Sequence, residues 1–152
     1  MWRRFLVVLA VGCGGKDPTT PTTVGDDDDA IVCEADTCIC EAAPCEATCA
    51  GAGACSVECT DTPTCDVECN GAPSCTLEAS GGPVDVSCAG SSVCSVECFF
   101  AETCEVDCTG TSNCYVHCPD FACTVTNCGA GCTVECGEAP QTAVDGTVVC
   151  TP

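Results

Sequence analysis

Two kinds of residue in this chain can do chemistry, the cysteines and the carboxylates. Among 152 residues there are 23 cysteines and 23 aspartates plus glutamates, but one histidine. Cysteines either pair as disulfides or bind soft metals as thiolates. Carboxylates bind hard cations such as Ca²⁺, and paired carboxylates can act as general acid and base. The spacing of these residues decides between the alternatives.

The spacing of the cysteines favours disulfides over a metal cluster. Metallothioneins hold soft metals with dense C-x-C and C-x-x-C pairs, whereas this chain has one C-x-C, Cys38-Ile39-Cys40, and no C-x-x-C. So high a cysteine content in a short chain is typical of a disulfide scaffold, which persists only outside the reducing cytosol. We therefore expect an exported protein whose cysteines are paired.

The N-terminus agrees with export. Residues 1–12 place two arginines before an apolar stretch that is too short to span a bilayer, which is the order of a secretory signal peptide. The sequence A-V-G-C that ends at Cys13 resembles the lipobox of bacterial lipoproteins. The resemblance implies a diacylglyceryl group on Cys13 and, because Gly14 follows it rather than aspartate, an outer-membrane location. The alternative is an ordinary cleaved leader and an extracellular protein.

Three segments follow from this interpretation. Residues 1–12 are the signal peptide, residues 13–30 a lipidated N-terminus with a disordered acidic Thr/Pro/Asp tether, and residues 31–152 a cysteine-rich β-repeat domain. Cleavage leaves Lys16 as the one basic residue against 23 acidic residues, a formal charge of −22. Such a surface repels nucleic acid and favours cations or a basic protein as partners. It does not predict an oligomeric state.

Within the domain, residues 45–136 repeat C-x-V-x-C-x-G-x-x-x about every ten residues. A fixed short period indicates a stacked repeat architecture. In C-x-V-x-C the cysteines and the valine occupy alternate positions, which places them on one face of a half-buried strand. We expect strands at residues 55–59, 65–69, 75–79, 84–88, 94–98, 104–108, 114–118 and 132–136.

One irregular repeat indicates how the cysteines pair. Where the pattern predicts cysteines, the chain has Ala79 and Val84, so two cysteines are missing from the two ends of one connector. Because partners tend to be lost together, we expect the last cysteine of each strand to bond the first cysteine of the next. The alternative, pairing along the columns, would leave Cys69 opposite the gap. The favoured rule pairs Cys33 with Cys38, Cys40 with Cys45, Cys49 with Cys55, Cys59 with Cys65, Cys69 with Cys75, Cys88 with Cys94, Cys98 with Cys104, Cys108 with Cys114, Cys118 with Cys123, Cys128 with Cys132 and Cys136 with Cys150.

Two all-β architectures accommodate these strands. In a disulfide-stapled β-solenoid each ten-residue repeat is one coil and the strands stack in parallel, whereas in an antiparallel β-meander each disulfide closes a hairpin. The Cα atoms of a disulfide lie within about 7 Å, but a straight five-residue strand is about 13 Å long. A solenoid is therefore expected to bend within C-x-V-x-C.

We favour the solenoid because residues 45–136 resemble small disulfide-crossed β-helices such as the insect antifreeze proteins, whose cysteines also bracket five residues. The resemblance implies the architecture alone. The regular Thr-x-Thr ladder of those proteins is absent here apart from Thr124 and Thr126, so ice binding does not follow.

Carboxylates recur at the second and fourth positions of the repeat, on the polar face of the strands. On strands about 4.8 Å apart, neighbouring carboxylates repel by about 1 kcal/mol per pair even in water. Such a column predicts weak binding of several calcium ions; the alternative is that the charges only keep a β protein soluble. We expect no other cofactor. The candidate calcium ligands are Glu58, Asp66, Glu68, Glu78, Glu97, Glu105 and Asp107.

The sequence offers little catalytic machinery. His117, the one histidine, stands where the repeat usually has glutamate, and Ser56 and Ser95 occur without an acid and a base in a recognisable order. We expect a cell-surface structural or binding lipoprotein without catalytic activity. The alternatives are a weak calcium-binding surface module and a small secreted hydrolase.

Phe99 and Phe100 stand in a connector where other repeats have small or polar residues. An exposed aromatic pair on a polar surface predicts a contact with a partner. The alternative is that the two rings cover a sheet edge, with Phe121 packed nearby.

Overall fold

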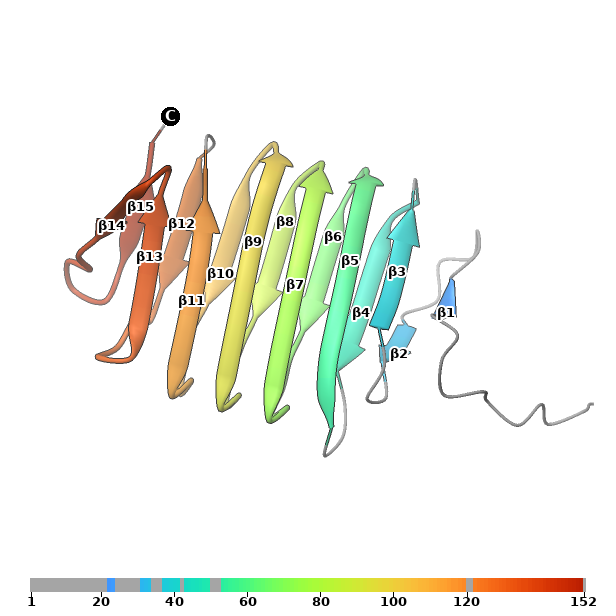
Figure 1. Ribbon diagram of the computed structural model, residues 1–152, viewed down its shortest axis with the longest axis horizontal. Coiled ribbons are helices and arrows are strands. Elements are labelled where there is room, and N and C mark those ends of the chain that lie inside the picture. Colours follow the sequence, from blue (N-terminus) through green and yellow to red (C-terminus); the bar gives the residue numbers. More distant parts are fainter. Residues whose placement is uncertain are drawn as a thin grey trace, which may run out of the picture.

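The structure, a computed structural model, describes residues 22–23, 31–33, 37–41, 43–49, 53–119 and 122–151. These residues form a β-solenoid (Figure 1) and contain no helix that is long and apolar enough to cross a membrane. Its strands are β1 (Thr22–Thr23), β2 (Ile31–Cys33), β3 (Thr37–Glu41), β4 (Cys45–Cys49), β5 (Ala54–Thr62), β6 (Cys65–Glu68), β7 (Ser74–Gly81), β8 (Val84–Ser87), β9 (Val93–Ala101), β10 (Cys104–Asp107), β11 (Asn113–Cys118), β12 (Cys123–Thr126), β13 (Cys132–Cys136), β14 (Ala139–Gln141) and β15 (Val148–Cys150).

From β1 to β13, consecutive strands alternate between two sheets. The eight-stranded sheet has the order β1-β3-β5-β7-β9-β11-β13-β14, and the seven-stranded sheet has the order β15-β12-β10-β8-β6-β4-β2. Strands that are neighbours in a sheet run parallel as far as β12 and β13. The solenoid is therefore confirmed over the meander, in which consecutive strands would pair with each other. The antiparallel strands β14 and β15 lie against the last coil.

Each coil contains two ten-residue repeats, so the prediction of one repeat per coil is wrong. Cys55, Cys75 and Cys94 are register partners on β5, β7 and β9, which means that successive coils are 20 and 19 residues long. The predicted bend within C-x-V-x-C is wrong for the same reason. β11 pairs with β13 without interruption from Cys114 to Cys118, so the strand runs straight and the chain bends in the connectors.

The interior of the stack is made of cystines and small apolar side chains. From β4 to β13, each strand has one central apolar residue that points inward and is at most 2% exposed. Burying each of these side chains contributes about 1.5–3 kcal/mol, so the single apolar residue per strand cannot hold the stack alone. The inward column of the eight-stranded sheet includes Val57, Leu77, Val96, Val116 and Val134, and that of the seven-stranded sheet Ala47, Val67, Val86, Val106 and Val125.

The disulfides cross the corners between the two sheets, with Cα–Cα separations of 5.2–6.5 Å. Every one of the eleven joins a pair that the missing-cysteine argument predicts. The two residues at the gap confirm its logic: Ala79 lies in register between Cys59 and Cys98, and Val84 takes the matching place in the opposite sheet. Both are 2% exposed and fill the space of the absent cystine.

All eight predicted strands form, but the repeat pattern missed β2, β3, β4, β12, β14 and β15. In β3 the pattern is shifted, because Cys38 lies in register with Val57 and not with a cysteine. β12 has no second cysteine, and β14 and β15 lie outside the repeat. β1, within the segment predicted to be a tether, pairs in parallel with β3.

At the corner that leads from the seven-stranded to the eight-stranded sheet, glycines stack with left-handed backbone. Gly71, Gly90 and Gly110 have φ of 73°, 71° and 68°, a conformation that costs glycine little. Directly after Gly90, the buried hydroxyl of Ser91 donates to the carbonyl of Cys69 in the preceding coil at 2.5 Å. The corner therefore satisfies its buried polar atoms by bonds from coil to coil.

The double substitution A79C/V84C is expected to add a twelfth disulfide. In the same corner, Cys40–Cys45 and Cys118–Cys123 also span five residues, with Cα separations of 5.8 and 6.3 Å. A loop this short contributes about 2 kcal/mol in the loop-entropy treatment. Loss of the valine packing removes part of that, so we expect a net gain of about 1 kcal/mol.

Intact-mass measurement before and after reduction, together with thermal unfolding, checks this result. A79S/V84S is the matched control, because it removes the same apolar contacts without a bond and should only destabilise. Two alkylatable thiols in the folded double cysteine variant would contradict the predicted corner geometry.

Candidate functional site

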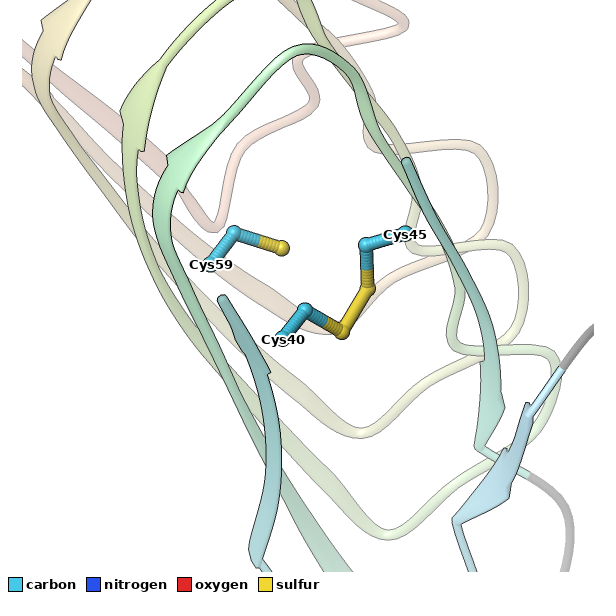
Figure 2. A group of neighbouring side chains, drawn as sticks. All are labelled: Cys40, Cys45 and Cys59. Carbon is cyan, nitrogen blue, oxygen red and sulfur yellow. A yellow bond between two sulfur atoms is a disulfide. The ribbon is translucent and has the colours of Figure 1, made fainter. Parts of the chain in front are cut away.

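The sulfur atoms of the interior come close together without forming a metal site. Cys40, Cys45 and Cys59 bring their Sγ atoms within 4.8 Å of one another. Figure 2 shows why these atoms are not free ligands: Cys40 and Cys45 are joined by a disulfide, and the Sγ of Cys59 lies beside it. Cys59 is itself bonded to Cys65. Three further groups of this kind in the described residues, Cys49/Cys69/Cys75, Cys104/Cys118/Cys123 and Cys108/Cys114/Cys132, consist of disulfide-bonded cysteines too.

The predicted calcium ligands fall into two groups on two sheets. Alternate repeats belong to opposite sheets, so carboxylates at the same repeat position do not form one column. Glu58, Glu78 and Glu97 are register partners on the outer face of the eight-stranded sheet. Asp66, Glu68, Glu105 and Asp107 lie on β6 and β10 of the seven-stranded sheet.

The seven-stranded sheet carries a longer ladder than the sequence predicted. Glu46, Asp66, Asp85 and Glu105 are successive register partners on β4, β6, β8 and β10. Of these, Glu46 and Asp85 were missing from the predicted ligands. Asp85 could have been found from the sequence, because it occupies the second position of the repeat like Asp66 and Glu105. Glu46 was missed because it precedes the strands that the pattern identified.

Burial and neighbouring carboxylates disfavour the charged form of Asp85. Burial raises the pKa of Asp85 above its ordinary value of 3.8, and Asp66, Glu105 and Asp107 raise it further by charge repulsion. A bound cation or a proton therefore relieves the repulsion at Asp85. In the part of the chain that the structure describes, however, no three carboxylates bring an oxygen each within 4.8 Å of one another.

Asp107 is engaged by protein donors instead. Asn127 Nδ2 donates to its Oδ1 at 2.8 Å, and the backbone N–H and the hydroxyl of Thr109 donate to the same oxygen at 3.0 and 2.7 Å. The Asn127 hydrogen bond is the main cause that lowers the pKa of Asp107, and the Thr109 bonds add to it. Asp107, a predicted calcium ligand, therefore has a structural role, because its hydrogen bond with Asn127 connects the end of β10 to the next coil.

His117 and its neighbours are bonded to one another across coils. The phenolic hydroxyl of Tyr115 donates to Glu135 at 2.8 Å, which raises the pKa of Tyr115. The His117 Nε2 lies 3.1 Å from the carbonyl oxygen of Gly137, and its ring meets that of Phe99 edge to face with centroids 6.0 Å apart. Ser56 and Ser95 lie on the outer face of β5 and β9, in the column next to the glutamates.

The predicted aromatic pair divides between two environments. Phe99 is half-buried, and Phe100 is 73% exposed with a left-handed φ of 55°. The alternative for this pair, a cover shared with Phe121, involves a residue outside the described part of the chain. The same holds for the predicted lipidation site Cys13 and the signal peptide.

Comparison of the chain with known protein families, curated proteins and solved structures finds no match.

Asp85→Asn is expected to stabilise the domain at neutral pH. Because the folded-state pKa of Asp85 is raised, its contribution to stability is fully present below the unfolded pKa and is lost as the pH rises through the folded pKa. At pH 7 the charged group therefore costs stability, and the amide removes this cost. Since solvent still reaches and screens this partly buried carboxylate, we expect a gain of about 0.5 kcal/mol that shrinks with added salt.

Urea unfolding at pH 7 and pH 3 checks both the sign and the pH window, because the gain should disappear at pH 3. Asp107→Asn is the control of opposite sign: its lowered pKa gives stability that is present above the unfolded pKa and is lost as the pH falls through the folded pKa. An Asp85→Asn variant that is less stable than the parent at pH 7 would disprove the repulsion in the ladder.

Proposed function

We propose that this chain is a non-catalytic cell-surface scaffold, a cystine-braced solenoid held at the outer membrane by a lipid on Cys13. The observation that supports this most is the filling of the interior. In successive coils the inward positions hold cystines and one small apolar side chain per strand. The two outer sheet faces are then the surfaces through which the domain meets its surroundings.

Covalent corners suit a protein outside the cell. A scaffold of this kind resists local opening, because every corner except the one between Ala79 and Val84 is closed by a disulfide that the oxidising exterior preserves. The net charge of −20 on the full chain keeps its parallel sheets apart from those of other molecules. The acidic segment before the domain serves as the spacer between the lipid and the coils.

The anchor can be tested by expressing the full chain in a Gram-negative host. We expect a palmitate analogue to label the wild-type protein, and the label to sediment with the outer membrane. Cys13→Ala should lose the label completely and leave the membrane fraction. Gly14→Asp is the matched control, which should keep the label but move to the inner membrane.

An unlabelled wild-type protein that is released like the Cys13→Ala variant would remove the lipid anchor from the proposal. The protein would then be an extracellular scaffold with an ordinary cleaved leader.

A second candidate function is weak calcium binding. The observation that favours it is the four-carboxylate ladder Glu46, Asp66, Asp85 and Glu105, in which the strand spacing of about 4.8 Å holds like charges side by side. Calcium accepts several carboxylate oxygens in loose geometry, so it could bridge neighbouring rungs.

Calorimetric titration with CaCl₂ compares the two faces of the stack. We expect D66N/D85N/E105Q to lose most of the calcium-dependent heat and to bind calcium at least tenfold more weakly. The reason is that only isolated carboxylates remain on the seven-stranded sheet. E58Q/E78Q/E97Q removes the same formal charge from the eight-stranded sheet and is the control. No calcium-dependent heat in the wild type, or equal losses in both variants, would reduce the ladder to a solubilising charge.

A further inference from the structure

An open hollow of about 250 Å³ lies on the eight-stranded sheet where β5, β7 and β9 end. Glu58 and Glu78 line it, and so do Phe99 and Phe100. Ala79 and Ser80 also contribute to its lining. Its volume is below that of typical pockets for drug-sized molecules, about 300–1,000 Å³, and suits a single side chain.

A missing residue in β7 creates this hollow. In β5 two residues separate the register positions Cys59 and Thr62, and in β9 two residues separate Cys98 and Ala101. In β7 only Ser80 separates the matching positions Ala79 and Gly81. The second of the two residues has left-handed backbone in both flanking strands, with φ of 52° at Asp61 and 55° at Phe100. In β7 this bulge residue is absent, so a gap opens between its neighbours.

Ser80, which lines the hollow, is hydrogen-bonded to the neighbouring strand β5. Its hydroxyl accepts a hydrogen bond from the backbone N–H of Asp61 at 3.3 Å and lies 3.5 Å from the carbonyl oxygen of Cys59. The buried Ala79 stands where the column otherwise has cysteine. The absent cystine and the absent bulge residue therefore occur in the same repeat, and together they set the position of the hollow.

The lining combines negative charge with aromatic rings. Glu58 and Glu78 are register partners on the adjacent strands β5 and β7, and both line the hollow. Phe99 is held by its edge-to-face contact with His117, and Phe100 is 73% exposed. An organic cation gains from both kinds of wall, because carboxylates pair with its charge and ring faces attract it. A bare metal ion gains little from the rings, and an anion is repelled.

We propose that this hollow binds an arginine side chain presented by a basic polypeptide. The planar guanidinium stacks on an aromatic ring and donates to a carboxylate in the same pose, which a compact ammonium does less well. The formal charge of −20 attracts a basic chain from a distance and raises the rate of encounter. This binding site goes beyond the scaffold function and needs neither the lipid anchor nor calcium.

The test is a ¹⁵N–¹H NMR titration of the full oxidised chain with the peptide acetyl-Gly-Ser-Arg-Ser-Gly-amide. We expect saturable shifts at the amides of Ser80, Gly81 and Phe99–Ala101. The same peptide with citrulline, which has the shape of arginine without its charge, should bind at least tenfold more weakly. Raising the salt concentration should weaken the arginine peptide alone.

Two variants and one matched control assign the site. F100L keeps an apolar side chain at the same backbone position but removes the ring, and E78Q removes one carboxylate; each should weaken binding about two- to fivefold. E68Q makes the same charge change on the seven-stranded sheet and should leave the affinity unchanged.

Four outcomes would overturn the proposal. The first three are equal binding of the citrulline and arginine peptides, equal effects of E68Q and E78Q, and no saturable shift at tens of millimolar peptide. The fourth is that CaCl₂ shifts the same amide signals, and shifts them as strongly in F100L as in the wild type. The last outcome would assign the hollow to a metal ion, and none of the four bears on the lipid anchor.

Discussion

The structure depends on a constraint at its corners, namely that the last cysteine of one strand and the first of the next must lie with their Cα atoms 5.2–6.5 Å apart. Straight strands cannot meet this distance between their own ends, so the chain turns a corner after each one. Successive strands thereby alternate between two sheets, and two repeats close one coil. Short disulfide loops contribute about 2 kcal/mol each in the loop-entropy treatment, comparable to the burial of one valine.

The same constraint leaves the outer faces free to vary. Because cystines and valines hold the interior, the outward positions of the strands can carry like charges in register, as Asp66, Asp85 and Glu105 do. Each exposed pair costs about 1 kcal/mol or less, which the covalent corners tolerate. Surface chemistry is therefore set by local departures from the repeat. The hollow beside Phe100 is one of these, since it follows from one deleted residue in β7.

Much of the fold could be predicted from the sequence because the repeat is so regular. Alternation predicted the inward columns, and the joint absence of cysteines at Ala79 and Val84 predicted the pairing that the disulfides have. The number of repeats per coil could not be predicted, since a two-residue period is the same whether a coil contains one strand or two. That error placed the carboxylates of opposite sheets in one column, so the separate ladder of the seven-stranded sheet was not predicted. The hollow could not be predicted either. The repeat in β7 is one residue shorter than those in β5 and β9, and the effect of this difference appears only when the three strands lie side by side.

The most direct test of this account is a map of the cystine-linked peptides of the purified protein. Free thiols are alkylated in denaturant without reductant, and pepsin digestion at low pH then prevents exchange. The account predicts no alkylated cysteine from Cys33 to Cys150 and peptides that join neighbours across a corner, such as Cys69 with Cys75 and Cys88 with Cys94. A protein with an intact β-sheet spectrum whose cysteines are mostly alkylated, or are linked along the columns, would contradict it.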